Sequence, residues 1–105
     1  MTRRPVTYSA TARRDLVGVI DFIAQNAGSR VAARWRRNFV DRINALSDQP
    51  HLGATDQDLG PGRRRLVLAP YLIVYEMAGS DSVHILRIVH GARDLPSLFE
   101  GLSDD

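Results

Sequence analysis

The strongest local pattern of apolar and polar residues lies between residues 71 and 94. Two apolar runs rich in β-branched residues, 71–77 and 83–90, flank the short polar segment Ala78-Gly79-Ser80-Asp81, and this pattern predicts a β-hairpin. In the second run both alternating sets of positions are mainly apolar, which indicates an internal strand covered on both faces. The two sets are Val83, Ile85 and Val89 on one face, and Leu86, Ile88 and His90 on the other.

Two segments nearer the N-terminus have the apolar spacing of amphipathic helices, from about Ala12 to Gln25 and from about Arg30 to Ser47. Between them, Gly28 suits a helix C-terminus and Ser29 suits an N-cap. A connection this short predicts two antiparallel helices side by side. On the second helix, Trp35 is expected to anchor the packing between the helices and a sheet.

Shorter strands are expected on both sides of the helices, at Pro5–Tyr8 and in the run RRRLVL at 63–68. The segment 48–62 contains two prolines and three glycines and is expected to be one long loop. After the last strand, Asp94 can cap a helical turn at 95–99. The element order β-α-α-β-β-β predicts an α+β fold, with a helix hairpin packed on a small, mostly antiparallel sheet.

Composition narrows the class of protein. The length of 105 residues predicts a single domain spanning 1–105. The chain has no cysteine, which excludes disulfides and thiolate chemistry, and its three dispersed histidines lack the spacing of metal ligands, so we expect neither a metal nor a cofactor. The polar N-terminus is unlike a secretory signal and no apolar run is long enough to span a membrane, so a cytoplasmic protein is expected.

The basic residues are unusual because all 14 are arginine, which leaves no lysine to act as a general base. One explanation is a GC-rich coding bias. The other is selection for planar guanidinium groups that bind carboxylate or phosphate. Six arginines on the two predicted helices, Arg13, Arg14, Arg30, Arg34, Arg36 and Arg37, are expected either to be solvated or to attract an acidic partner.

An ordered set of short motifs runs through nearly the whole chain. They are Tyr8-Ser9, Asp15-Leu16, Ile20-x-x-Ile23-Ala24, Leu59-x-x-Gly62-x-Arg64, Tyr71-Leu72-Ile73-x-Tyr75 and Ile85-Leu86-Arg87-x-x-His90-Gly91-Ala92-Arg93-Asp94. With these motifs the chain resembles the RelE/ParE superfamily of type II toxin–antitoxin toxins, and more closely the ParE, or plasmid-stabilisation, branch. The closing H-G-A-R-D is the most specific part of the resemblance.

The resemblance implies a small cytoplasmic bacterial toxin that inhibits growth. It also implies a cognate antitoxin, a segment of which wraps the toxin in an inactive hetero-oligomer. ParE-type members poison DNA gyrase, whereas RelE-type members cleave mRNA in the ribosome.

RNA cleavage requires a base for the 2′-hydroxyl, cations for the phosphate and an acid for the leaving oxygen. The resemblance implies that RelE-type toxins use sheet lysines and arginines with a tyrosine or histidine near the C-terminus. Here the lysines are absent and no tyrosine follows the last strand, so a nuclease would depend on Arg64, Arg87 and His90. We therefore favour a ParE-like gyrase poison, with a RelE-like ribonuclease, or a degenerate toxin that only binds antitoxin, as alternatives.

Candidates for contact with the target or the antitoxin are the charged and aromatic residues of the last strands. They are Arg63, Arg64, Arg65, Tyr71, Tyr75, Arg87, His90 and Arg93. Each has a structural alternative: an arginine on an apolar strand must find a partner, and for Arg87 we expect Asp94, Asp15 or the sheet edge. The two tyrosines either pack in the core or stack on a base.

Overall fold

The computed structural model describes residues 3–79 and 81–94. Its elements, in chain order, are β1 (Val6–Tyr8), α1 (Ala10–Ala27), α2 (Ser29–Asp48), β2 (Ala54–Thr55), the 3₁₀ helix η1 (Gln57–Leu59), β3 (Arg63–Leu68), β4 (Tyr71–Ala78) and β5 (Ser82–His90). A helical segment at 91–94 follows β5. The predicted strand at 63–68 is confirmed at both ends, and each predicted helix is slightly longer than expected.

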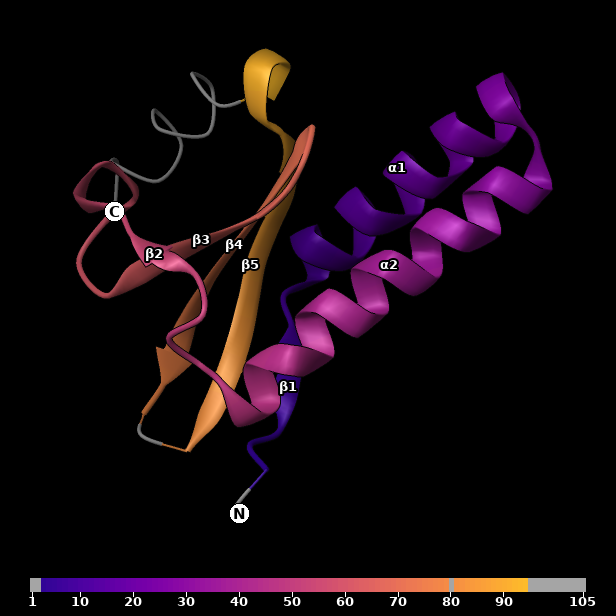
Figure 1. Cartoon of the computed structure of the whole chain (residues 1–105). Coiled ribbons are helices and arrows are strands. Elements are labelled where there is room, and N and C mark those ends of the chain that lie inside the picture. The colour runs from indigo at the N-terminus through magenta and orange to yellow at the C-terminus, as the bar shows by residue number, and fades with distance from the viewer. Residues whose placement is uncertain (1–2, 80, 95–105) are drawn as a thin grey trace.

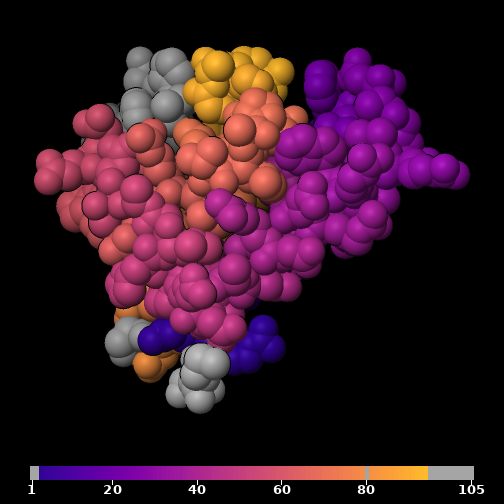
Figure 2. All heavy atoms as spheres, viewed as in Figure 1, coloured from indigo at the N-terminus to yellow at the C-terminus, as the bar shows by residue number. Residues whose placement is uncertain are grey.

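Local sequence signals determine both ends of the helix hairpin. The Ser9 hydroxyl accepts a hydrogen bond from the Ala12 amide at 2.9 Å, so it caps α1 at Ala10. Gly28, with φ of 93°, ends α1 and immediately precedes α2. The two helices run antiparallel as predicted, and the end of the hairpin near Gly28 projects away from the sheet (Figures 1 and 2).

The strands form one five-stranded sheet in the order β1-β5-β4-β3-β2. β1 is parallel to β5, and the other pairs are antiparallel. The helix hairpin covers one face of this sheet (Figure 1). This arrangement confirms the α+β fold with a mostly antiparallel sheet, and it places β5 between β1 and β4.

The core lies between the hairpin and the sheet. Trp35 packs within 6.0 Å of Phe39 and 5.6 Å of Tyr71, measured between ring centroids, so it joins the helices to the sheet as expected. A second, smaller apolar cluster lies on the opposite face of the sheet, where Leu59 of η1 covers part of it. That cluster contains Leu59, Leu72, Val74, Leu86 and Val89.

One irregularity in β5 changes which residues face the helices. Leu86 is an extra residue in the pairing of β5 with β4, so the alternation of faces shifts after it. Ile88 therefore joins Val83 and Ile85 on the helix side, whereas Val89 joins Leu86 on the other side. The expectation of strict alternation along 83–90 is wrong for Ile88 and Val89.

The segment 48–62 is not the structureless loop that its composition suggested. It contains β2, which extends the sheet beside β3, and η1, which Asp56 caps by accepting a hydrogen bond from the Asp58 amide at 3.0 Å. The buried Tyr75 hydroxyl donates to the Pro50 carbonyl and accepts from the Gly53 amide, both at 2.8 Å. These two bonds hold the segment against the end of the sheet.

The described part of the chain ends at Asp94. The predicted helical turn at 95–99 lies outside the described residues. The expected cap of this turn by Asp94 therefore stays a prediction; within the described residues Asp94 ends the helical segment 91–94 and accepts a hydrogen bond from the His90 amide. No helix in the described parts of the chain combines the length and apolar character needed to cross a membrane.

Candidate functional site

The three consecutive arginines at the start of β3 all bind within the fold. Arg63 donates to the Glu76 carboxylate at 3.3 Å and to the Leu59 carbonyl at 3.0 Å. The other two arginines contact the segment before β3: Arg64 donates to the Gly53 carbonyl at 2.7 Å, and Arg65 is paired with Asp56 at 3.5 Å. The triplet therefore fastens β2 and η1 to the sheet.

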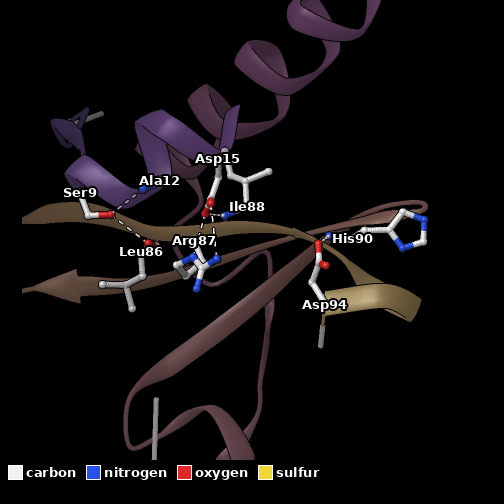
Figure 3. Close-up of polar contacts among 8 residues, drawn as sticks. All are labelled: Ser9, Ala12, Asp15, Leu86, Arg87, Ile88, His90 and Asp94. Carbon is white, nitrogen blue, oxygen red and sulfur yellow. Dashed lines mark hydrogen bonds and ion pairs between the residues drawn. The ribbon is translucent and has the colours of Figure 1, made fainter. Parts of the chain in front are cut away.

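Arg87 is paired with Asp15, one of the three partners expected for it. The Asp15 carboxylate accepts from Arg87 Nε at 2.8 Å and Nη2 at 3.4 Å, and also from the Ile88 amide at 2.9 Å (Figure 3). Among the described residues no strand lies beside this part of the β5 edge, because β1 pairs with β5 only as far as Ile85. The Asp15 carboxylate therefore accepts the Ile88 amide, as a carbonyl of a neighbouring strand would.

Ser9, directly before α1, also forms a hydrogen bond with this edge of β5. Its hydroxyl donates to the Leu86 carbonyl at 2.9 Å while it accepts from the Ala12 amide (Figure 3). Ser9 and Asp15 together attach the first turns of α1 to the bulged part of β5. The Leu86 carbonyl and the Ile88 amide are thereby bonded within the chain.

The two tyrosines proposed for base stacking are buried. Tyr71 packs against Trp35 and Phe39, and Tyr75 lies wholly inside the core. Burial raises the pKa of Tyr75 above its ordinary value of 10.0, although the Gly53 amide and the positive charge of Arg64 oppose this rise. Both residues take the structural alternative, and neither presents an open ring face for stacking in this structure.

His90 ends β5 and caps the helical segment that follows. Its Nδ1 accepts from the Arg93 amide at 3.2 Å, while the Asp94 carboxylate accepts from the His90 amide at 3.0 Å. Arg93 in turn lies 3.6 Å from the Asp94 carboxylate and over the Phe22 ring of α1 at 5.9 Å. Arg93 and Asp94 therefore form an ion pair within this segment.

The three residues on which a nuclease would depend are not gathered around one point. Arg64 and Arg87 lie on either side of β4, which separates their backbones by about 10 Å. His90 is three residues beyond Arg87 along β5, again about 10 Å, and its ring points away from the Arg87–Asp15 pair (Figure 3). The described residues also contain no group of three or more acidic or histidine side chains that could hold a metal.

Another hollow lies between α1 and α2, beside Tyr8 at the end of β1. It is a groove of about 560 Å³ with an apolar floor and charged walls. Its lining residues are Tyr8, Arg13, Leu16, Val17, Ile20, Asp21, Arg36 and Val40.

Comparison with known families decides what kind of protein this is. Residues 6–95 match the model of the ParE toxin of the type II toxin–antitoxin system parDE. The chain belongs to the ParE toxin family. It is 35% identical to Toxin ParE3 of Caulobacter vibrioides over 81 residues, which cover 77% of this chain and 80% of that toxin.

Solved structures agree with the ParE assignment at the level of the fold. The chain is similar to a chain of the chromosomal ParDE system of P. aeruginosa, with a TM-score of 0.73, 23% identity, and coverage of 84% of this chain and 96% of that one. It is also similar to a chain of the RelBE2 toxin–antitoxin complex of Mycobacterium tuberculosis, with a TM-score of 0.60, 25% identity, and coverage of 86% and 93%. The expected membership of the RelE/ParE superfamily, closer to ParE, is confirmed.

Sequence reasoning missed the tertiary contacts of two residues that build this ParE domain. Gly53 lies so close to the sheet that a Cβ there would be 2.7 Å from both the Arg65 carbonyl and the Tyr75 ring. Residue spacing does not show this constraint, because it comes from strands later in the chain. Ser9 stands directly before a helical stripe, where an N-cap is expected, but its second bond to β5 has no sequence signal.

Proposed function

We propose that this ParE-family toxin inhibits growth by binding and poisoning DNA gyrase, and that a cognate antitoxin neutralises it. The proposal rests on one observation: Arg64, Arg87 and His90 each form a hydrogen bond with another group of the same chain. Residues held in this way are poor candidates for proton transfer to a substrate. A toxin that acts by binding a macromolecular surface needs no such transfer.

Similarity to Toxin ParE3 over most of the chain supports the gyrase branch of the superfamily over the ribosomal branch. In the gyrase mechanism the toxin would stabilise the complex in which gyrase has cut DNA, so that breaks accumulate. The contribution of the toxin is then binding free energy, spread over a surface. This mechanism is consistent with a chain that has no lysine and no metal-ligand spacing.

An antitoxin partner is proposed on two grounds. The solved neighbours belong to a ParDE toxin–antitoxin system and to a RelBE2 toxin–antitoxin complex. This chain also exposes apolar side chains on its helices, including Val17 and Phe22. Such positions are typical of surfaces that a partner covers. We therefore propose a hetero-oligomer of toxin and antitoxin as the resting state.

The gyrase proposal is tested with purified toxin and purified gyrase. We expect supercoiling to fall and cleaved DNA to accumulate as toxin is added, and we expect an equimolar amount of antitoxin to reverse both effects. The matched control is the toxin–antitoxin complex assembled beforehand. Unchanged supercoiling at saturating toxin would reject the proposal.

A RelE-like ribosome-dependent ribonuclease is the second candidate, and the similarity to the RelBE2 chain is the observation in its favour. Primer extension on translated mRNA, in the cells used for a DNA-damage readout, separates the two. Discrete cuts that disappear in a folded Arg87→Ala variant would favour the ribonuclease. Expression with no growth arrest and no damage of either kind would instead indicate a degenerate toxin that retains only antitoxin binding.

A further inference from the structure

The helix α2 carries five arginines, two of which face other parts of the chain. Arg42 Nη2 donates to the Val67 carbonyl of β3 at 3.3 Å, and Arg36 lines the hollow between the two helices. The other three are exposed and form no ion pair or side-chain hydrogen bond with the described residues. They are Arg30, Arg34 and Arg37. Their positive charge is therefore available to a partner outside this chain.

These three arginines lie on one face of α2 and are called here the outer arginine row. They are spaced four and then three residues apart, which places them within about 60° of one another around the helix axis, in a row about 10 Å long. The buried residues Ala32 and Phe39 lie on the opposite side of the helix. The row therefore points directly away from the core.

The sequence around the row contains nothing that balances its charge. Residues 22–40 include four arginines and neither aspartate nor glutamate, and the flanking acids are Asp21 and Asp41. Among the described side chains none caps the start of α2, and its first turn has no acid, so the positive end of the helix dipole adds to this charge. The same end of the hairpin projects away from the sheet (Figures 1 and 2). A large anionic partner can therefore reach the row.

The chemistry of this face favours a nucleic acid over a protein as the partner. Protein interfaces are centred on buried apolar or aromatic anchors, whereas interfaces with DNA are polar and strongly positive. The large apolar residues that the described chain exposes are Val17, Phe22, Leu52 and Val67, and none of them belongs to α2. Guanidinium groups match phosphate oxygens in geometry as well as in charge. Duplex DNA carries one phosphate charge per about 1.7 Å of its axis, so a row about 10 Å long meets several phosphates in any register.

We propose that the outer arginine row binds the phosphate backbone of duplex DNA, and that this DNA is the segment held by gyrase. The inference rests on the proposed function only in naming gyrase-bound DNA as the source of the phosphates. The toxin then contacts both the enzyme and its DNA, and the row adds binding free energy to the complex in which the DNA is cut. Because phosphates carry no sequence information, binding through the row is independent of base sequence.

The first experiment measures the binding of full-length toxin to a short fluorescein-labelled DNA duplex by fluorescence anisotropy, at salt concentrations from about 50 to 200 mM. The row variants are Arg34→Gln alone and a triple variant that combines it with Arg30→Gln and Arg37→Gln. The matched control for the single variant is Arg14→Gln, and the matched control for the triple variant combines it with Arg3→Gln and Arg13→Gln. These control positions are exposed and lie in the N-terminal segment and at the start of α1, at the other end of the hairpin from Gly28. Circular dichroism and thermal unfolding establish that all variants fold.

We expect the row variants to lose both affinity and salt dependence. Each phosphate contact contributes about −0.9 to the slope of log affinity against log salt, so Arg34→Gln should flatten this slope by about 0.9 and the triple row variant by about 2.7. At the lowest salt the triple row variant should bind at least about tenfold more weakly than the unsubstituted toxin. The control variants should stay within about threefold, because exposed charges farther away than a Debye length are largely screened.

Three outcomes would overturn the proposal. Equal losses in the two triple variants would show a response to net charge alone. Absence of DNA binding by the unsubstituted toxin would leave the row without the ligand proposed for it. Binding of polyglutamate but not of DNA through the same arginines would indicate an acidic protein as the partner.

A gyrase cleavage assay on the same proteins separates this proposal from the proposed function. We expect the triple row variant to need at least about fivefold more toxin for half-maximal DNA cleavage than its matched control. If gyrase is unaffected by the unsubstituted toxin but DNA binding depends on the row, the gyrase proposal fails and the row remains a DNA-binding surface. If gyrase is poisoned and neither DNA binding nor poisoning depends on the row, the row proposal fails alone. If DNA binding depends on the row but poisoning does not, the assignment to gyrase-bound DNA is overturned.

Discussion

Asp15 of α1 and Arg87 of β5 are 72 residues apart in sequence and form an ion pair in which Asp15 Oδ2 lies 2.8 Å from Arg87 Nε. The same carboxylate oxygen accepts the Ile88 amide at 2.9 Å. The side chain of Asp15 is only 16% exposed and that of Arg87 is 34% exposed, so solvent screens the pair incompletely. This ion pair attaches α1 to the sheet at Arg87, one of the three residues on which a nuclease would depend.

We expect Asp15→Ala to lower the free energy of unfolding by about 2–3 kcal/mol, because it leaves both the Arg87 guanidinium and the Ile88 amide without their partner. Urea denaturation measures the change. Asp21→Ala, at an exposed acid of the same helix with no ion pair, is the matched control and should shift stability by less than about 0.5 kcal/mol. Equal effects of the two substitutions would show that the Asp15 contacts contribute little.

Two glycines should respond in opposite directions to alanine. A Cβ on Gly53 would lie 2.7 Å from the Arg65 carbonyl and the Tyr75 ring, so Gly53→Ala should cost about 1–3 kcal/mol. Gly18 lies inside α1 with nothing within 4 Å of a Cβ, so Gly18→Ala should stabilise the protein by about 0.5–1 kcal/mol. Thermal unfolding of both variants checks the pair, and a destabilised Gly18→Ala would contradict the helical argument.

The elements with long, regular patterns could be predicted from the sequence. The helix hairpin, the run at 63–68 and the β4–β5 hairpin each carry apolar positions at a regular period. β2 could not be predicted, because two residues carry no period. The faces of β5 were mispredicted after Leu86, because a bulge is created by the pairing of two strands and leaves no local signal.

The candidate site was harder to predict than the fold for a related reason. The sequence identified the arginines of the last strands as chemically unusual, but their roles depend on which carboxylate or carbonyl reaches them. Arg87 had three possible partners, and the attachment of α1 to the β5 edge selects Asp15. Arg64 bonds to a carbonyl in a segment that composition alone assigned to loop. Tertiary contacts of this kind leave no trace in residue spacing.

Alkaline pH should destabilise this protein through its buried tyrosine. Burial raises the pKa of Tyr75 above 10.0 in the folded state, so above about pH 10 the unfolded chain loses this proton more readily than the folded one. Stability is therefore fully present below that pH and falls as the pH rises through the folded pKa. The chain has neither lysine nor cysteine, so tyrosine is the side-chain type that titrates near pH 10. A change in the free energy of unfolding near this pH can therefore be assigned to tyrosine.

Tyr75→Phe tests this directly. At neutral pH we expect a loss of about 1–3 kcal/mol, because the Pro50 carbonyl and the Gly53 amide lose their shared partner. Between pH 9 and about pH 11 the variant should lose less stability than the unsubstituted protein. Part of the pH dependence should remain, since burial also raises the pKa of Tyr8. An unchanged pH dependence in the variant would exclude Tyr75 as its source.

His90 allows the structural and catalytic interpretations to be separated with two substitutions. The structure gives its Nδ1 the role of a helix cap that accepts the Arg93 amide. Because asparagine is among the best N-cap residues, His90→Asn should retain both stability and growth inhibition, whereas His90→Ala should lose about 1 kcal/mol of stability. Growth arrest on induced expression and thermal unfolding are measured for both variants. A stable His90→Asn protein that no longer arrests growth would instead indicate that the imidazole takes part in the activity itself, as expected of a ribonuclease, because asparagine can replace the cap but cannot transfer a proton near neutral pH.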